Sequence, residues 1–401
     1  MIRVSIESSN GRKDRMGDWL GLSNGNCLAG EERKNKMSTS KTGKICVGVD
    51  LHKHQLTICA LDSITGEVLH TGEYATSEEG YQNFINKMHD LEEVGEIELA
   101  VETTGNAKYF KNKMEAEGFY VLVVNTNKFK VISTSTSKTD ANDALTLAYY
   151  LSKEMLPKSY LCDQTSEEIR RMLKTRSILV STIVKIKNQI HGMMLGYGVE
   201  TNSAQFQSKK KRQELINYLT EHKFSQFTVM SLKLTLDILD KTSEEIKSIE
   251  ETLKETLKEN ETIEILETVP GIGFIGAATI LSYVNDIKRF DGDFKKFSSY
   301  LGIVPGVHNS AGTEHYGHIT KRGPQELRTA FVQVAMGVIR QPQNTGNWKM
   351  IEDYKLMKIN KGTGRAVIAL TRKMARIVFV MLNTKQRFNY DLIKLSQKEL
   401  A

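Results

Sequence analysis

Carboxylates end two apolar segments in the first half of the chain. Asp50 closes the run that begins at Ile45, and Glu102 closes a similar run further along. Asp140 and Asp143 lie three residues apart at the start of a segment with helical periodicity, so their side chains share one helix face. We interpret the four residues as ligands of a divalent metal, because Mg²⁺ prefers carboxylate oxygens and clustered carboxylates repel one another without a cation.

Such a site is suited to cutting and joining phosphodiesters. Two Mg²⁺ or Mn²⁺ ions about 4 Å apart can stabilise both the attacking and the leaving oxygen. Taken singly, each carboxylate has a simpler explanation. Asp50 could be a turn residue. Asp140 or Asp143 could cap a helix N-terminus or match the positive end of the helix dipole. The combination of two strand ends with one helix start favours the metal site.

The second half of the chain contains a candidate nucleophile. Ser310 lies between Asn309 and an Ala-Gly pair, in a predicted loop that would expose its hydroxyl, although a serine in such a loop is usually a turn residue. Ser298 and Ser299 are predicted to lie in a helix instead. Several glycines, through their backbone N–H groups, and several cationic side chains could contact DNA phosphates. Alternatively, the glycines only form tight turns and the cations are solvated surface charges. The residues concerned are Gly271, Gly273, Lys321, Arg322, Arg328, Arg365, Arg372 and Lys373.

The elements that must position the carboxylates alternate between residues 44 and 155. Segments with β-branched residues predict strands at 45–50, 55–61, 68–74, 97–102 and 120–124. Amphipathic segments predict helices that start near Ser77, Ala107 and Asp140. Three strands followed by alternating helices and strands predict a mixed α/β sheet of the ribonuclease-H-like (RuvC-like) type, although other α/β folds share this order.

A helical region follows this predicted domain. Residues 165–265 contain no proline, and apolar residues recur at the three- and four-residue steps of a coiled-coil seam. We predict a helical coiled-coil arm at 156–262 and a mainly α-helical domain at 263–385, with a helix-hairpin-helix-like turn near its start. Residues 1–43 are predicted to be a disordered or over-called extension, with Met37 as an alternative start, and 386–401 a tail.

Composition narrows the class of protein. Lys and Arg number 55 against 48 Asp and Glu, a net charge of +7 that is compatible with a polyanionic partner without establishing one. The mean hydropathy of −0.35 and the absence of a long apolar run exclude a membrane-spanning protein. The four cysteines show neither paired nor zinc-type spacing. We therefore expect a soluble cytoplasmic protein.

These motifs resemble, in matching order, those of the DEDD transposases of the IS110 insertion-sequence family, which includes the Piv-type DNA invertases. The likeness covers roughly residues 44–385. It rests on Val-Gly-Val-Asp50-Leu-His-Lys, Ala-Val-Glu102-Thr-Thr-Gly-Asn, Lys138-Thr-Asp140-Ala-Asn-Asp143, Val269-Pro-Gly-Ile-Gly, Tyr300-Leu-Gly-Ile-Val-Pro305, Ser310-Ala-Gly and Gly317-His-Ile-Thr-Lys-Arg-Gly323. The chain departs from the family at Thr126, where proline is common. It also departs at Asn309-Ser310-Ala311-Gly312, where the family often has Ser-Ser-Gly-Gly.

The resemblance implies a function. Asp50, Glu102, Asp140 and Asp143 would bind Mg²⁺ or Mn²⁺, and Ser310 would attack DNA to form a covalent phosphoserine link. The family also implies a homo-oligomer, dimer or tetramer, and a structured non-coding guide RNA as a partner beside donor and target DNA. The predicted function is thus a transposase or site-specific recombinase that cuts and rejoins DNA.

Three alternatives compete with this prediction. A RuvC-like nuclease or Holliday-junction resolvase would share the carboxylates but lack covalent serine chemistry. An actin-like sugar kinase or ATPase would need an Asp-x-Gly phosphate loop after a later strand, and Asp291 follows no predicted strand. A coiled-coil DNA-binding scaffold would leave the four carboxylates without a role.

Overall fold

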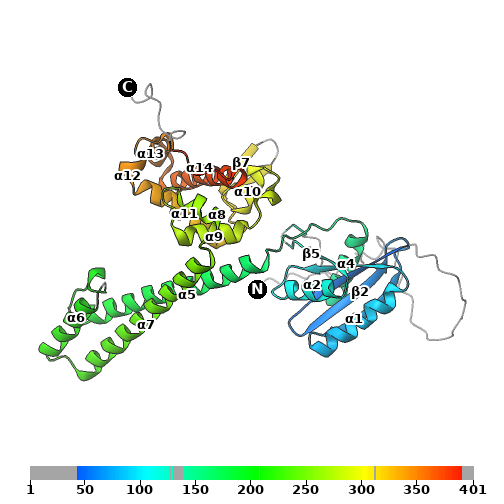
Figure 1. Cartoon of the computed structure of the whole chain (residues 1–401), viewed down its shortest axis with the longest axis horizontal. Helices are drawn as coiled ribbons and strands as arrows, with labels where there is room; N and C mark the ends of the chain where they lie inside the picture. The colour runs from blue at the N-terminus through cyan, green and yellow to red at the C-terminus, as the bar shows by residue number, and fades with distance from the viewer. Residues whose placement is uncertain (1–42, 127, 130–138, 207, 311–312, 391–401) are drawn as a thin grey trace, which may run out of the picture. The chain divides into compact units, whose positions relative to one another are not determined.

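The structure is a computed structural model that describes residues 43–126, 128–129, 139–206, 208–310 and 313–390. At residue 203 and over 307–310 and 313–316 it describes the backbone alone. The chain divides into two compact units, the first ending at Tyr160 and the second beginning at Leu161 (Figure 1). The predicted extension up to residue 42 and the tail from 391 onward lie outside the described residues.

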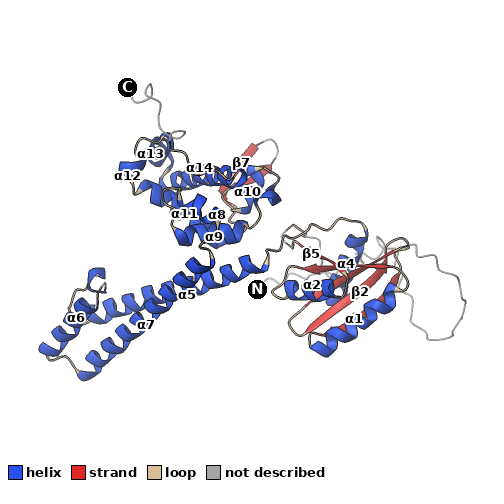
Figure 2. Cartoon of the chain, viewed as in Figure 1, coloured by secondary structure: helices blue, strands red, loops and turns tan. Residues whose placement is uncertain are grey.

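The first unit contains a mixed five-stranded sheet in the order β3-β2-β1-β4-β5, drawn in red in Figure 2. Its strands are β1 (Lys44–Leu51), β2 (Gln55–Asp62), β3 (Val68–Ala75), β4 (Glu96–Glu102) and β5 (Tyr120–Val124). β1 pairs antiparallel with β2 and parallel with β4, and β4 pairs parallel with β5. The sequence predicts each of these strands, and the sheet is consistent with a ribonuclease-H-like fold.

Two helices, α1 (Glu78–Glu92) and α2 (Ala107–Ala116), pack against each other beside the sheet. α1 begins as predicted at Ser77, whose hydroxyl accepts a hydrogen bond from the Gly80 backbone N–H. The rings of Phe84 and Phe110 lie 5.9 Å apart and join the two helices. Both side chains are fully buried, so this contact belongs to the core of the unit.

A third helix, α4 (Asp140–Ser152), covers one face of the sheet. Its Leu147 and Leu151 share a buried cluster with Cys46 of β1 and Ala100 of β4. Side chains alternate between the two faces of a strand, so the neighbouring buried residues of β1 and β4 point to the opposite face. The face that carries Cys46 and Ala100 is therefore the α4 face.

α4 approaches β1 so closely that only glycine fits at position 48. A Cβ there would lie 2.0 Å from the carbonyl oxygen of Ala144 and 2.5 Å from the backbone nitrogen of Ala148. Both atoms belong to the helix backbone and cannot rotate away. This contact fixes the start of α4, with Asp140 and Asp143, against the strand that ends near Asp50.

Long helices open the second unit. α5 (Gln164–Leu195) and α7 (Gln226–Thr256) pack along each other, and α6 (Lys209–Glu221) lies between them in the chain. Apolar residues from the three helices close one end of this arm, including Ile190, Leu219 and Leu232. The predicted arm is therefore helical, while its pairing as a coiled coil stays a prediction. α6 itself was not predicted, since its first turn is a run of lysines.

The rest of the second unit is mainly helical, as predicted, and contains one hairpin. Its elements are α8 (Glu261–Glu267), α9 (Phe274–Val284), α10 (Phe294–Tyr300), β6 (Pro305–Ser310), β7 (Thr313–Ile319), α11 (Gln325–Ile339), α12 (Pro342–Thr345), α13 (Lys349–Lys361) and α14 (Thr363–Thr384). The antiparallel β6–β7 pair was not predicted. Among the described residues, no helix has both the length and the apolar character needed to cross a membrane.

The arm and these helices share one hydrophobic core. Ile169 of α5 and Leu253 of α7 belong to the same buried cluster as Phe331 of α11. The Arg170 guanidinium adds a polar contact, because it donates hydrogen bonds of 2.9 and 2.7 Å to the Ser282 carbonyl oxygen. One end of the arm therefore packs into the core of these helices, and its other end has a buried cluster of its own. The predicted domain limit at 262 and 263 stays a prediction.

The Gly48 contact makes a prediction about stability. We expect Gly48→Ala to lower the free energy of unfolding of the first unit by about 3 kcal/mol, because overpacking against backbone atoms forces the helix away from the strand. Gly105→Ala is the control, since a Cβ there meets nothing within 4 Å. Hydrogen–deuterium exchange of β1 peptides in the full-length protein measures the effect. Equal protection of β1 in the two variants would contradict the prediction.

Candidate metal centre

Asp50 is the second-last residue of β1 and lies on the sheet face that α4 covers. Side chains on this face alternate with those that point away, so Asp50 shares the face with Gly48 and Cys46. Its side chain is 14% exposed. The carboxylate is thus held at the edge of the buried core, where a ligand can still reach it.

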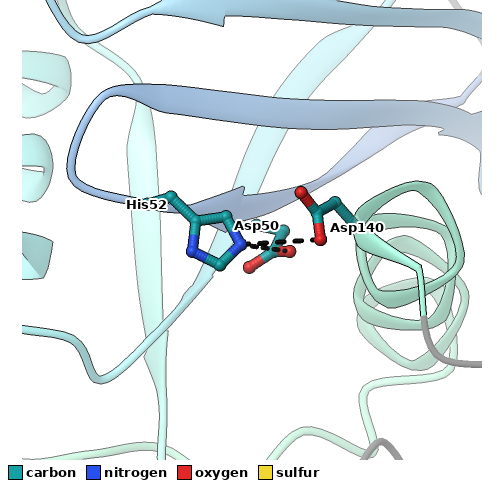
Figure 3. A group of neighbouring side chains, drawn as sticks. All are labelled: Asp50, His52 and Asp140. Atoms are coloured by element: carbon teal, nitrogen blue, oxygen red, sulfur yellow. Dashed lines mark ion pairs between the residues drawn. The ribbon is translucent and has the colours of Figure 1, made fainter.

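Two further side chains meet Asp50 at this edge. Nε2 of His52 lies 3.2 Å from Oδ2 of Asp50 and 3.6 Å from Oδ1 of Asp140 (Figure 3). One potential ligand atom from each of the three residues lies within 4.8 Å of the others. β1, the turn after it and the start of α4 therefore bring three metal-ligating groups to one point.

Glu102 is placed next to this group by the register of the sheet. Val49 of β1 pairs with Val101 of the parallel strand β4, so Asp50 and Glu102 follow at adjacent strand ends. Glu102 also lies two residues after Ala100 and so faces α4. Among the described residues, Glu102 and Asp143 are not part of the 4.8 Å group that Asp50, His52 and Asp140 form.

Asp143 lies one helical turn after Asp140 and is 9% exposed. The first turn of α4 is fixed by Thr139, whose hydroxyl accepts a hydrogen bond of 3.3 Å from the Asn142 backbone N–H. The Thr139 carbonyl oxygen accepts one of 2.9 Å from the Asp143 N–H. The two aspartates therefore lie in the capped first turn of α4, and this helix starts where the sequence predicts it.

The electrostatics of the group follow from this crowding. Burial raises the pKa of the Asp50 carboxyl above its ordinary value, and the charges of Asp140 and Asp143 raise it further. His52 acts in the opposite direction. The ionised carboxylate is therefore less stable in the folded protein than in the unfolded chain, and a bound cation would relieve this cost.

His52 is the residue of this group that sequence reasoning missed. It lies two positions after Asp50, at the start of the turn between β1 and β2. The side-chain amide of Asn106 donates a hydrogen bond of 3.0 Å to its carbonyl oxygen. The sequence feature that could have identified His52 is its position just beyond a strand end that carries a carboxylate.

The predicted nucleophile lies in the second unit. The sequence predicts Ser310 in a loop, whereas the structure has it as the last residue of β6, paired with Thr313 of β7. Ser298 and Ser299 lie in α10, as predicted, and Ser298 is fully buried. The backbone thus places Ser310 beside the connection of a hairpin.

Some predicted nucleic-acid contacts have structural roles. Gly271 adopts φ +88°, and a Cβ there would lie 2.8 Å from the Val334 carbonyl oxygen, so this glycine permits close packing against α11. Arg328 donates hydrogen bonds of 3.3 and 3.2 Å to the carbonyl oxygens of Leu301 and Lys321. Gly273, in contrast, has open space around it at the start of α9.

Other predicted contacts are exposed cationic side chains. Lys321 and Arg322 are exposed in the loop after β7, and Arg365, Arg372 and Lys373 are exposed on α14. Near the end of α14 lies an open cavity of about 530 Å³ whose charged lining residues are mostly cations. These charged lining residues are Lys349, Lys373, Arg376, Arg387 and Asp353. The sequence does not predict this cavity, because its walls come from separate segments.

Comparisons with known proteins agree with the two halves of the chain. A DEDD model for IS110, described as a transposase, matches residues 47–199, and a model described as the transposase IS116/IS110/IS902 family matches residues 263–350. The chain is 25% identical to the transposase for insertion sequence element IS1111A of Coxiella burnetii over 88% of this chain and 94% of the relative. It is 26% identical to the transposase for insertion sequence element IS1328 of Yersinia enterocolitica, over 71% and 83%.

The raised pKa of Asp50 leads to a prediction. A carboxyl whose pKa is higher in the folded state loses stability as the pH rises from its unfolded pKa through its folded pKa. We therefore expect Asp50→Asn to raise the melting temperature of the metal-free protein at pH 7, with no gain at a pH below the ordinary Asp range. Millimolar Mg²⁺ should stabilise the original protein but not the variant. Thermal melts with and without EDTA measure both effects.

Asp90→Asn, an exposed change on α1, is the matched control. It should leave both the metal-free melting temperature and the response to Mg²⁺ unchanged. An equal response to Mg²⁺ in the Asp50 variant would show that the ion binds elsewhere.

Proposed function

The chain belongs to the IS110 family of transposases, and we propose that it cuts and rejoins DNA with two groups, an acidic metal site and a serine nucleophile. The observation that carries the proposal is the convergence of Asp50 and Asp140 at the edge of the first unit. They approach each other although they are far apart in the sequence, and both lie inside the segment that matches the DEDD transposase model.

We assign the metal to Asp50 and Asp140, with Glu102 and Asp143 completing the site. The donors fit the group, since short carboxylates at strand and helix ends offer the oxygen ligands that Mg²⁺ and Mn²⁺ take. When bound, one or two such ions would stabilise the charge that develops on a phosphodiester during its cleavage. The sheet register and the capped start of α4 support this assignment, because they fix the strand ends and the helix turn that carry the carboxylates.

The proposed nucleophile is the Ser310 hydroxyl. Its oxygen would form a bond to phosphorus while the bond from phosphorus to one DNA strand breaks, and the departing oxygen takes up a proton. Attack by a second strand on the phosphoserine would then restore the serine and join the DNA. Ser310 lies within the segment that matches the second transposase model, which supports this assignment.

The partners follow from the same family. We propose donor and target DNA, a structured guide RNA and a homo-oligomer, dimer or tetramer, on the basis of the sequence resemblance. The exposed cations of α14 supply positive charge for contact with phosphates. The kinase alternative has no support, because Asp291 follows the short helix Ile287–Phe290 rather than a strand.

Trapping the covalent intermediate tests the proposal. Incubation with element-junction DNA, Mg²⁺ and co-purified RNA should yield a protein–DNA adduct that resists denaturation. Ser310→Ala should abolish the adduct and reduce strand exchange at least ~10³-fold, as expected for loss of a nucleophile. Asp50→Ala should abolish both as well. The readout is a denaturing gel with labelled DNA.

Ser299→Ala is the matched control, because Ser299 is an exposed serine of α10 in the same unit. It should retain the adduct. DNA cleavage that needs Asp50 but survives Ser310→Ala would replace the proposal with a metal-dependent nuclease.

Salt dependence tests the basic surface of α14. We expect Arg365→Ala and Arg372→Ala each to weaken DNA binding across sequences and to reduce the slope of log affinity against log salt by about 1. Lys258→Ala, an exposed change after α7, should leave the slope unchanged. Fluorescence anisotropy at several salt concentrations measures the slopes. Identical slopes in all three variants would remove α14 from the DNA interface.

A further inference from the structure

We propose that His52 is itself a metal ligand, through Nε2, and that this makes the centre favour Mn²⁺ over Mg²⁺. The inference rests on the proposed metal-dependent function and adds a ligand to the carboxylates assigned above. It starts from the observation that one imidazole nitrogen contacts both Asp50 and Asp140 (Figure 3).

The distances fit a shared ion. A metal with ligands at about 2.1 Å separates neighbouring ligand atoms by about 3.0 Å and opposite ones by about 4.2 Å. Nε2 of His52 lies 3.2 Å from the Asp50 carboxylate and 3.6 Å from that of Asp140. Both values lie inside this range, and one ligand atom from each of the three residues lies within 4.8 Å of the other two, so a single ion could contact all three groups with small side-chain adjustments.

The backbone of His52 is fixed as a ligand-bearing position requires. Its N–H donates a hydrogen bond of 2.9 Å to the Gln55 carbonyl oxygen, which closes the turn between β1 and β2. Its carbonyl oxygen accepts the hydrogen bond from Asn106, a residue just before α2. The turn is therefore tied both to its own strand pair and to the segment that follows Glu102.

His54 is an exposed histidine of the same turn, and its carbonyl oxygen also accepts a hydrogen bond, of 3.1 Å from the Thr76 N–H. Nothing places its ring in the group of three ligand atoms that the described residues form. A comparison of variants at His52 and His54 therefore distinguishes metal coordination at one position from a general effect of positive charge near the carboxylates.

The chemistry of imidazole sets the metal preference. A neutral imidazole nitrogen is a better ligand for first-row transition ions than for Mg²⁺, which keeps oxygen ligands and holds its water molecules firmly. Mn²⁺ is the weakest binder of that series but still accepts a nitrogen ligand more readily than Mg²⁺ does. Removing the nitrogen should thus cost Mn²⁺ affinity while a water replaces it in the Mg²⁺ form. If His52 were only a counterion to the carboxylates, its removal would affect both ions alike.

Pulsed electron paramagnetic resonance of Mn²⁺ bound to the full-length protein tests the ligand directly. We expect a nitrogen coupling in the original protein that changes on uniform ¹⁵N labelling, disappears in His52→Ala and persists in His54→Ala. Calorimetry should show the Mn²⁺ dissociation constant raised at least ~10-fold by His52→Ala, as for loss of a group that shapes a metal site. The Mg²⁺ constant, measured by competition, should change less than about twofold, since Mg²⁺ does not depend on nitrogen.

The remaining outcomes are distinct. Mn²⁺ that binds only when Asp50 is present but shows no nitrogen coupling would overturn the role of His52 and leave the proposed metal-dependent function standing. Equal weakening of Mn²⁺ and Mg²⁺ binding without a nitrogen coupling would make His52 a counterion and also overturn the inference. Metal binding that is unchanged by Asp50→Ala would overturn both proposals.

Discussion

The close packing of α4 on β1 at Gly48 is the constraint on which the acidic group depends. Sheet register alone places Asp50 beside the end of β4, and helix periodicity alone places Asp140 with Asp143. Neither brings the strand and the helix together. That step requires a backbone contact that leaves no room for a Cβ at Gly48. The acidic group is therefore a product of packing, and an apolar cluster joins β1 to α4 beneath it.

Much of this arrangement could be predicted from the sequence, because its causes are local. β-Branched runs that end in a carboxylate predict strand ends, and an apolar repeat that begins near Asp140 predicts the start of a helix. His52 could not be found in this way. Its place depends on a hydrogen bond from Asn106, 54 residues away, and on a contact with α4. The β6–β7 hairpin was missed because glycines and histidines interrupt its apolar alternation.

The type of a residue can also be compatible with two different roles, and only its packing in the structure shows which role it has. A glycine next to a helix start can admit a phosphate or another helix, and Gly271 does the second because Val334 lies against it. An arginine can contact DNA or hold a loop, and Arg328 holds two backbone carbonyl groups. On α14, Lys373 forms an ion pair with Asp353, whereas among the described residues no such internal contact involves Arg365 or Arg372. They remain the stronger basis for a nucleic-acid surface.

The two proposed chemistries are built in different units, and each has its own structural basis. The acidic group needs only the sheet and α4, all of which lie before residue 160. The hairpin that carries Ser310 belongs to a unit whose core includes the arm helices, since Ile169 and Leu253 pack in the cluster of Phe331. A change at Asp50 therefore removes charge without disturbing the frame of Ser310, and a change at Ser310 leaves the acidic group assembled. Loss of DNA exchange in either variant would then report on chemistry rather than on folding.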